Sequence, residues 1–120
     1  MESILDSIKQ QLGIAEDYRH FDNQIIQHIN SVFFDLNQLG VGPEGGFTIE
    51  DNLSTWEEFL NGRTDLNAVQ TYVFLNVKLL FDPPQTSFVL DSYQRRIKET
   101  EWRLNVQVES IKSDSPEILI

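Results

Sequence analysis

The chain lacks cysteine, and this absence excludes disulfide scaffolds, thiolate metal sites and cysteine nucleophiles. It also lacks any apolar run close to the roughly 18 residues that a membrane-spanning helix needs. Its first residues, Met1 to Asp6, show neither the basic start nor the apolar stretch of a signal peptide. We therefore expect a chain made in the cytoplasm, with no membrane association.

Basic residues are also scarce, with 9 Lys and Arg against 19 Asp and Glu and a formal net charge of −10. Such a charge argues against attraction to the phosphates of nucleic acids. The imbalance is uneven, because residues 1–60 contain only Lys9 and Arg19 as bases, whereas residues 61–120 are nearly neutral. This asymmetry would orient subunits head to tail or repel DNA from a surface, or it serves solubility alone.

What the chain does contain is a core-forming composition, with 40% hydrophobic residues over 120 positions. Apolar residues recur at helical spacing in several segments. The pattern predicts an all-α fold, a compact bundle of about five helices over residues 2–12, 22–38, 54–61, 65–81 and 86–108. We expect a helical domain over 1–108 and a flexible C-terminal tail over 109–120, where the period is lost.

The predicted helix boundaries follow from capping and breaking residues. A glycine-rich loop at 40–53 separates the second and third helices, and Phe47–Ile49 within it is a candidate for a short extended piece. The other signals are Gly13 as a C-cap, Asp22 as an N-cap, Ser54–Glu57 as a capping box, Thr64 or Asp65 as an N-cap, and Asp82–Pro84 as a breaker.

The fourth predicted helix is apolar almost all the way round. Val69, Val73 and Val77 share one side of the helix, and Leu75 lies on another. A helix of this kind is central in a fold or is covered by a partner. We therefore expect this helix to lie in the middle of the bundle.

No group of residues indicates catalysis. The two histidines, His20 and His28, lie apart; His20 and Asp22 are conceivable metal ligands, but a surface histidine explains them as well. The glycines of 40–46 follow a helix and lack the lysine and serine of a phosphate loop. Glu57 and Glu58 are adjacent and point in different directions. We expect no enzymatic activity, no cofactor and no metal.

Aromatic residues on polar helix faces are the stronger signal. In the fifth helix Trp102 falls opposite the apolar arc, beside Arg95, and aromatic and arginine side chains anchor many protein interfaces. The alternatives are that a loop or the tail covers these groups, or that the arginines pair with Glu99 within the helix. The candidate interface residues are Phe74, Phe88, Arg95, Trp102 and Val106, with Phe47 and Ile49 of the loop and Ile118, Leu119 and Ile120 of the tail.

The tail ends in the apolar residues Ile118, Leu119 and Ile120. Such an end can order on a partner, for example as an added strand. Fraying is the common behaviour of chain termini and is the alternative.

Several segments together resemble one family. They are Ile25–Phe33, Leu36–Pro43, Thr71–Val73, Leu79–Pro84, Ile97–Glu99 and Glu101–Val106. Over about residues 1–108 the chain is similar to the head–tail connector (adaptor, or head completion) proteins of long-tailed bacteriophages, of the type found in phages and prophages of Gram-positive bacteria.

The resemblance implies a structural virion protein and no active site. Members of this family are helical and assemble as an oligomeric ring, commonly of about twelve subunits, beneath the portal. The implied partners are copies of the chain itself, the phage portal protein and a tail-side connector protein. DNA passes through such a ring without specific binding. The implied location is the virion, after synthesis in the bacterial cytoplasm.

A second hypothesis comes from the charge alone. A small acidic phage regulator that binds a host protein, or that mimics DNA, would also be strongly acidic. It would need acidic groups at phosphate-like spacing on one face.

Overall fold

The structure, a computed structural model, describes residues 2–63 and 66–113 of the chain, with side chains up to Glu109. No strand forms in these ranges, and Ser3 and Thr55 make one isolated antiparallel bridge. The described residues form the helices α1 (Ile4–Leu12), α2 (Asp22–Gln38), α3 (Trp56–Leu60), α4 (Val69–Phe81) and α5 (Ser87–Ser113). The predicted all-α bundle of five helices is therefore confirmed.

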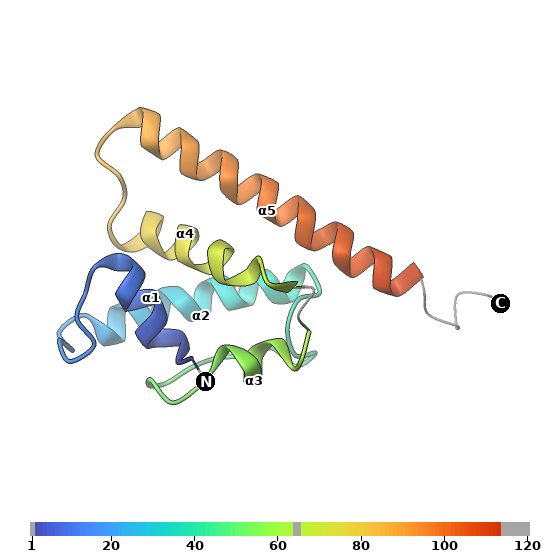
Figure 1. Ribbon diagram of the computed structural model, residues 1–120, viewed down its shortest axis with the longest axis horizontal. Helices are drawn as coiled ribbons and strands as arrows, with labels where there is room; N and C mark the ends of the chain where they lie inside the picture. Colours follow the sequence, from blue (N-terminus) through green and yellow to red (C-terminus); the bar gives the residue numbers. More distant parts are fainter. Residues whose placement is uncertain (1, 64–65, 114–120) are drawn as a thin grey trace.

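Helix α4 lies in the middle of the fold. It packs against α2 on one side and α5 on the other, so that α5 and α3 occupy opposite sides of the molecule (Figure 1). The buried side chains of α4 point in more than one direction; they are Val69, Tyr72, Val73, Leu75 and Val77. This burial on several faces explains the nearly continuous apolar character of the helix and confirms its predicted central position.

The start of α2 differs from the prediction. The helix begins at Asp22 itself, after Phe21, and no side chain caps it. The Asp22 carboxylate instead forms an ion pair with Lys9, with 2.8 Å between Nζ and Oδ1. The prediction of Asp22 as the N-cap was wrong because a buried cation from another helix competes for the same carboxylate.

Lys9 is the most unusual residue of the interior, since its side chain is only 1% exposed. Its ammonium group donates hydrogen bonds to the carbonyl oxygens of Glu16 at 3.0 Å and Tyr18 at 2.8 Å, in addition to the ion pair with Asp22. An ammonium has three protons, and two of them have carbonyl partners here, while the Asp22 carboxylate balances the charge. The contacts fix the connector between α1 and α2 against both helices.

The capping box of α3 is present but lies one residue later than predicted. The Thr55 hydroxyl accepts from the Glu58 backbone N–H at 3.3 Å, and the Thr55 N–H donates to Glu58 Oε1 at 3.0 Å. Ser54 does not serve as the cap, because its carbonyl oxygen accepts a hydrogen bond from the Ile4 N–H at 3.0 Å. This contact ties the start of α3 to the N-terminal segment.

No strand forms at Phe47–Ile49 in the described loop. The side-chain amide of Asn30 in α2 instead pairs with the backbone of Ile49, accepting from its N–H at 2.8 Å and donating to its carbonyl oxygen at 3.0 Å. Gly42, with φ of +91°, lies so close to Phe59 that a Cβ there would be 2.7 Å from the ring. Both contacts hold the loop against the core.

The bounds of the last two helices also differ from the prediction. α5 continues through Ser113, five residues beyond the expected end, since neither glycine nor proline occurs before Pro116. α4 starts at Val69, and the proposed caps Thr64 and Asp65 lie outside the described residues.

Candidate interaction surface

The second half of α5 is attached to the body of the molecule. Thr100, Leu104 and Val108 are buried, and a Cβ on Gly40 would lie only 3.2 Å from the Val108 side chain. No residue of α5 before Thr100 is buried. In Figure 1 the two helices α4 and α5 diverge toward the start of α5. The first half of α5 therefore presents most of its surface to the outside.

A side-chain hydrogen bond joins α4 to α5. The Tyr72 hydroxyl donates to Glu101 Oε2 at 3.1 Å. Burial, and then the nearby charge of Glu101, raise the pKa of the Tyr72 hydroxyl far above its ordinary value. The hydroxyl therefore keeps its proton, which is what a donor to a carboxylate requires.

The side of α5 that faces away from α4 carries large apolar groups. Phe88 is 78% exposed, Trp102 67% and Val106 43%. Phe88, Arg95 and Trp102 follow one another at seven-residue steps, which is nearly two helical turns, so they form one stripe. We call Phe88, Arg95, Lys98, Trp102 and Val106 the α5 outer face. A shallow cavity beside Trp102 is also lined by Lys98, Glu99 and Arg103.

The structure thus brings together four of the candidate residues, Phe88, Arg95, Trp102 and Val106, on one exposed face. On the opposite side of α5 lie the buried residues Thr100, Leu104 and Val108. The glycine-rich loop does not cover them, as their exposure shows. The tail beyond Ser113 lies outside the described residues.

Other candidate residues lie elsewhere. Ile49 is only 2% exposed, so its expected surface position is corrected: the Asn30 contacts hold it in the core. Phe47 is half-buried, with its ring 5.6 Å from that of Phe33, and Phe74 of α4 is half-buried against the core. Ile118, Leu119 and Ile120 lie outside the described residues.

Several exposed apolar residues were missed by the sequence analysis, among them Phe34 and Leu53. Phe34 of α2 is 65% exposed and Leu53 of the loop is 76% exposed. The exposure of Phe34 could have been predicted from helix geometry. Phe34 follows Ile25 by nine residues, which places it on the opposite side of the helix from the apolar stripe. Leu53 gave no signal, since a loop has no periodicity from which exposure can be deduced.

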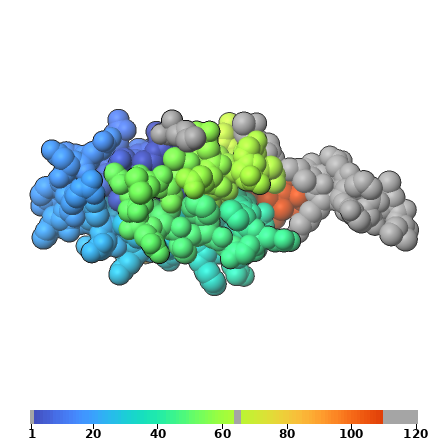
Figure 2. Space-filling model, turned by 90° about the horizontal axis from the view of Figure 1, so that it is seen from below, coloured from blue at the N-terminus to red at the C-terminus, as the bar shows by residue number. Residues whose placement is uncertain are grey.

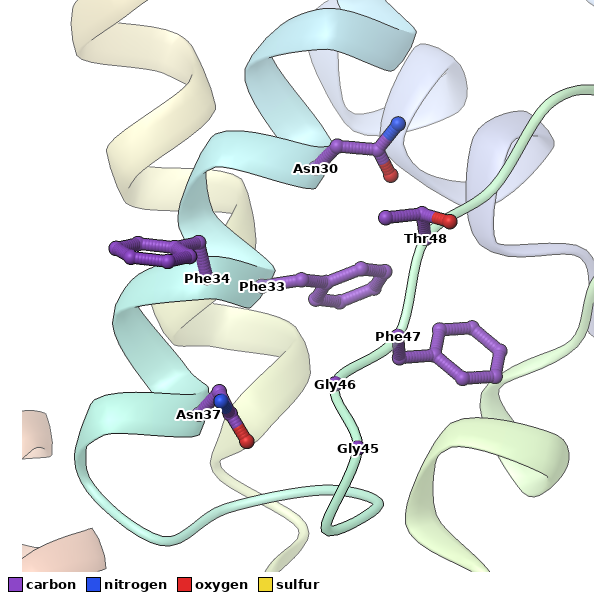
Figure 3. A pocket seen from close by; sticks show the side chains of 8 residues that line it. All are labelled: Asn30, Phe33, Phe34, Asn37, Gly45, Gly46, Phe47 and Thr48. Carbon is purple, nitrogen blue, oxygen red and sulfur yellow. The ribbon is translucent and has the colours of Figure 1, made fainter.

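A cavity of about 340 Å³ lies between α2 and the loop. Figure 3 shows Phe33 directed toward Phe47 across this space, whereas Phe34 points to the other side of α2. The polar groups that line the cavity are the amides of Asn30 and Asn37 and the hydroxyl of Thr48. These neutral groups can form hydrogen bonds, but they include no acid, base or activated nucleophile.

Ionisable groups do not gather elsewhere into a site for metal binding. Within residues 2–63 and 66–113, no three His, Asp or Glu side chains are grouped so that they could hold a metal ion. The His20 ring packs 4.8 Å from that of Phe21, and the neighbouring Asp22 is engaged by Lys9. None of the helices in the described ranges has both the length and the apolar character needed to cross a bilayer.

Comparison with known protein families gives a match. A family model described as phage connector protein matches residues 4–110. The matched segment begins with α1 and ends within the last turns of α5, so it includes the α5 outer face. No curated protein and no solved structure matches the chain significantly.

Proposed function

The chain belongs to the phage connector protein family, and on this premise we propose that it is a ring-forming subunit of the head–tail connector of a long-tailed bacteriophage. In this role several copies assemble between the portal and the tail. The ring joins the head to the tail-side connector protein, and DNA passes through its centre. The role is structural and requires no reacting group.

The observation that carries this proposal is the extent of the family match, which covers residues 4–110 and therefore α1 to α4 and most of α5. The α5 outer face gives independent support. Exposed aromatic groups next to basic ones are characteristic of binding surfaces. A subunit that works by contact needs such a surface.

The net charge of −10 is compatible with a conduit for DNA. Phosphates are repelled weakly by a negatively charged wall, so the DNA does not adhere during passage. The charge therefore supports passage without binding, in contrast to the basic surfaces of DNA-binding proteins.

Electron microscopy of the protein mixed with the portal protein of the same phage tests the proposal. We expect rings attached to the portal, and sedimentation velocity should show a complex much larger than either component. Trp102→Ala, which changes the α5 outer face, should reduce the yield of attached rings. If neither rings nor portal-bound protein appear at high concentration, the chain is not a connector subunit of this kind.

A further inference from the structure

The α5 outer face lies in the most basic part of the chain. Residues 95–103 contain four of the nine basic residues, namely Arg95, Arg96, Lys98 and Arg103. The same segment contains two acids, and one of these, Glu101, accepts the hydrogen bond from Tyr72. Trp102, 67% exposed, lies beside Lys98 and Arg103, and the acid Glu99 lines the same shallow cavity. This part of the surface is locally cationic, although the chain is strongly anionic overall.

A second exposed surface has the opposite character. No lysine or arginine occurs between Arg19 and Arg63, and the end of the loop together with α3 contains closely spaced acids. The exposed residues there are Glu50, Asp51, Leu53, Glu57 and Glu58, which we call the α3 acidic face. Leu53, at 76% exposure, places a large apolar group among these charges. Both faces therefore combine an exposed apolar residue with charges, but of opposite sign.

The two faces lie on opposite sides of the molecule. In Figure 1 α5 and α3 are separated by α4 and α2. Figure 2, seen from the side of α3, shows the loop and α3 across the surface, while only a small part of α5 is visible at one end. A single molecule therefore cannot bring its two faces together. A two-fold dimer through the α3 acidic face would place like charges against each other.

We propose that the α5 outer face of one copy docks on the α3 acidic face of the next copy. This inference rests on the proposed function, in which the chain assembles with itself. Complementary charge selects the partner face and its orientation, while Trp102 and Leu53 contribute apolar contacts. A contact between two different faces is heterologous, and such contacts close into rings when the rotation between copies permits it.

Disulfide cross-linking tests the contact directly, because the chain has no cysteine of its own. The variants Leu53→Cys and Glu99→Cys are prepared separately, one with an affinity tag, so that the three possible dimers migrate differently. They are mixed, combined with the portal protein and oxidised. We expect the 53–99 heterodimer to exceed both homodimers at least tenfold. Asp17→Cys, on the exposed connector between α1 and α2, is the matched control and should form little dimer with Glu99→Cys.

Charge exchange gives a second test. Two double variants each reverse the charge of one face: Arg95→Glu with Lys98→Glu, and Glu50→Lys with Glu57→Lys. Each double variant should lower the association constant at least about tenfold in sedimentation experiments. All four substitutions in one chain restore opposite charges and should restore association. Glu16→Lys with Asp17→Lys changes the net charge by the same amount as the Glu50 and Glu57 pair, away from both faces, and should leave association intact.

The outcomes separate this inference from the proposed function. If rings form on the portal but only homodimers, or no dimers, are obtained on oxidation, the docking of α5 on α3 is wrong and the connector function stands. The docking is also overturned if the variant with all four charge substitutions associates no better than the variants changed on a single face. The absence of both rings and cross-links contradicts the connector function as well.

Discussion

The two tryptophans of the chain mark two regions with opposite relations to solvent. Trp56, at the start of α3, is 2% exposed, and its indole N–H donates to the Ser7 hydroxyl at 2.7 Å. Trp102, in α5, is 67% exposed and lies among charged side chains. The first stabilises the fold of α1 to α4, whereas the second contributes little to it. An aromatic residue thus indicates the core or a contact surface only together with its surroundings.

The charged residues extend this comparison. Lys9 is buried in the same region as Trp56 and is held by two carbonyl oxygens and the Asp22 carboxylate, whereas Arg95 and Lys98 are exposed on α5. In the first region polar groups hold the chain together from within. In the second, apolar and basic groups remain available to another molecule.

Leu75→Asp should prevent folding. Leu75 is 7% exposed in the central helix α4, and an unpaired carboxylate there would be removed from water without compensation. Circular dichroism should show the loss of helix and of a cooperative thermal transition. The matched control is Leu80→Asp on the same helix, where the side chain is 53% exposed and the fold should persist. A folded Leu75→Asp variant would contradict the central position of α4.

Trp56→Ala and Trp102→Ala should divide stability from assembly. Removing the buried indole should lower the free energy of unfolding by about 3–5 kcal/mol, because it leaves a cavity and removes the hydrogen bond that the Ser7 hydroxyl accepts. Trp102→Ala should change it by less than about 1 kcal/mol and should instead weaken assembly on the portal. Urea unfolding and ring yield are measured for both variants. Equal losses of stability would show that Trp102 belongs to the core.

Lys9→Met should destabilise the protein by about 3 kcal/mol, because it removes the buried cation of Asp22 and leaves that carboxylate only the exposed Arg19, at 3.4 Å. The measurement is the urea midpoint at neutral pH. The double variant Lys9→Met with Asp22→Leu removes both charges and should recover part of the loss. If Lys9→Met alone is as stable as the parent chain, the buried ion pair does not hold the segment between α1 and α2 in place.

Tyr72→Phe should have the smallest effect, about 1 kcal/mol, through the loss of its hydrogen bond to Glu101. The raised pKa of Tyr72 has a consequence at high pH, since the native state keeps a proton that the unfolded chain releases near pH 10.0. Stability should therefore be fully present below that pH and should fall as the pH rises above it. The stability of the Tyr72→Phe variant should fall less steeply over this range, which thermal unfolding between pH 8 and 11 would show. An unchanged dependence of stability on pH would exclude this contribution of Tyr72.

The local sequence pattern was sufficient to predict most of the helices. The α1 stripe and its Gly13 cap, the central position of α4 and the outward direction of Trp102 all follow from residues within one or two helical turns of each other. The limits of α5 were harder to place, because the helix passes Val108 without a residue that breaks it. The exposure of Phe34 was within reach of the same reasoning.

Contacts between segments that are distant in the sequence could not be predicted from local pattern. Asp22 has the chemistry of an N-cap, but Lys9 from another helix takes its carboxylate. Ile49 is as apolar as any interface residue, and only the Asn30 amide, 19 positions earlier, shows why it lies in the core. The exposure of Leu53 likewise depends on how the loop folds over its neighbours. Spacing along the chain carries no information on such partners.

The sequence by itself determined the all-α class, the order of the helices, the resemblance to connector proteins and the separation of charge along the chain, because these depend on periodicity, motif and composition. Only the tertiary structure decided that the α5 outer face and the α3 acidic face lie on opposite sides of one molecule (Figure 1). The packing of α4 between α2 and α5 sets that separation. Its physical cause is burial of apolar surface on several sides of one helix, which joins segments that no local pattern connects.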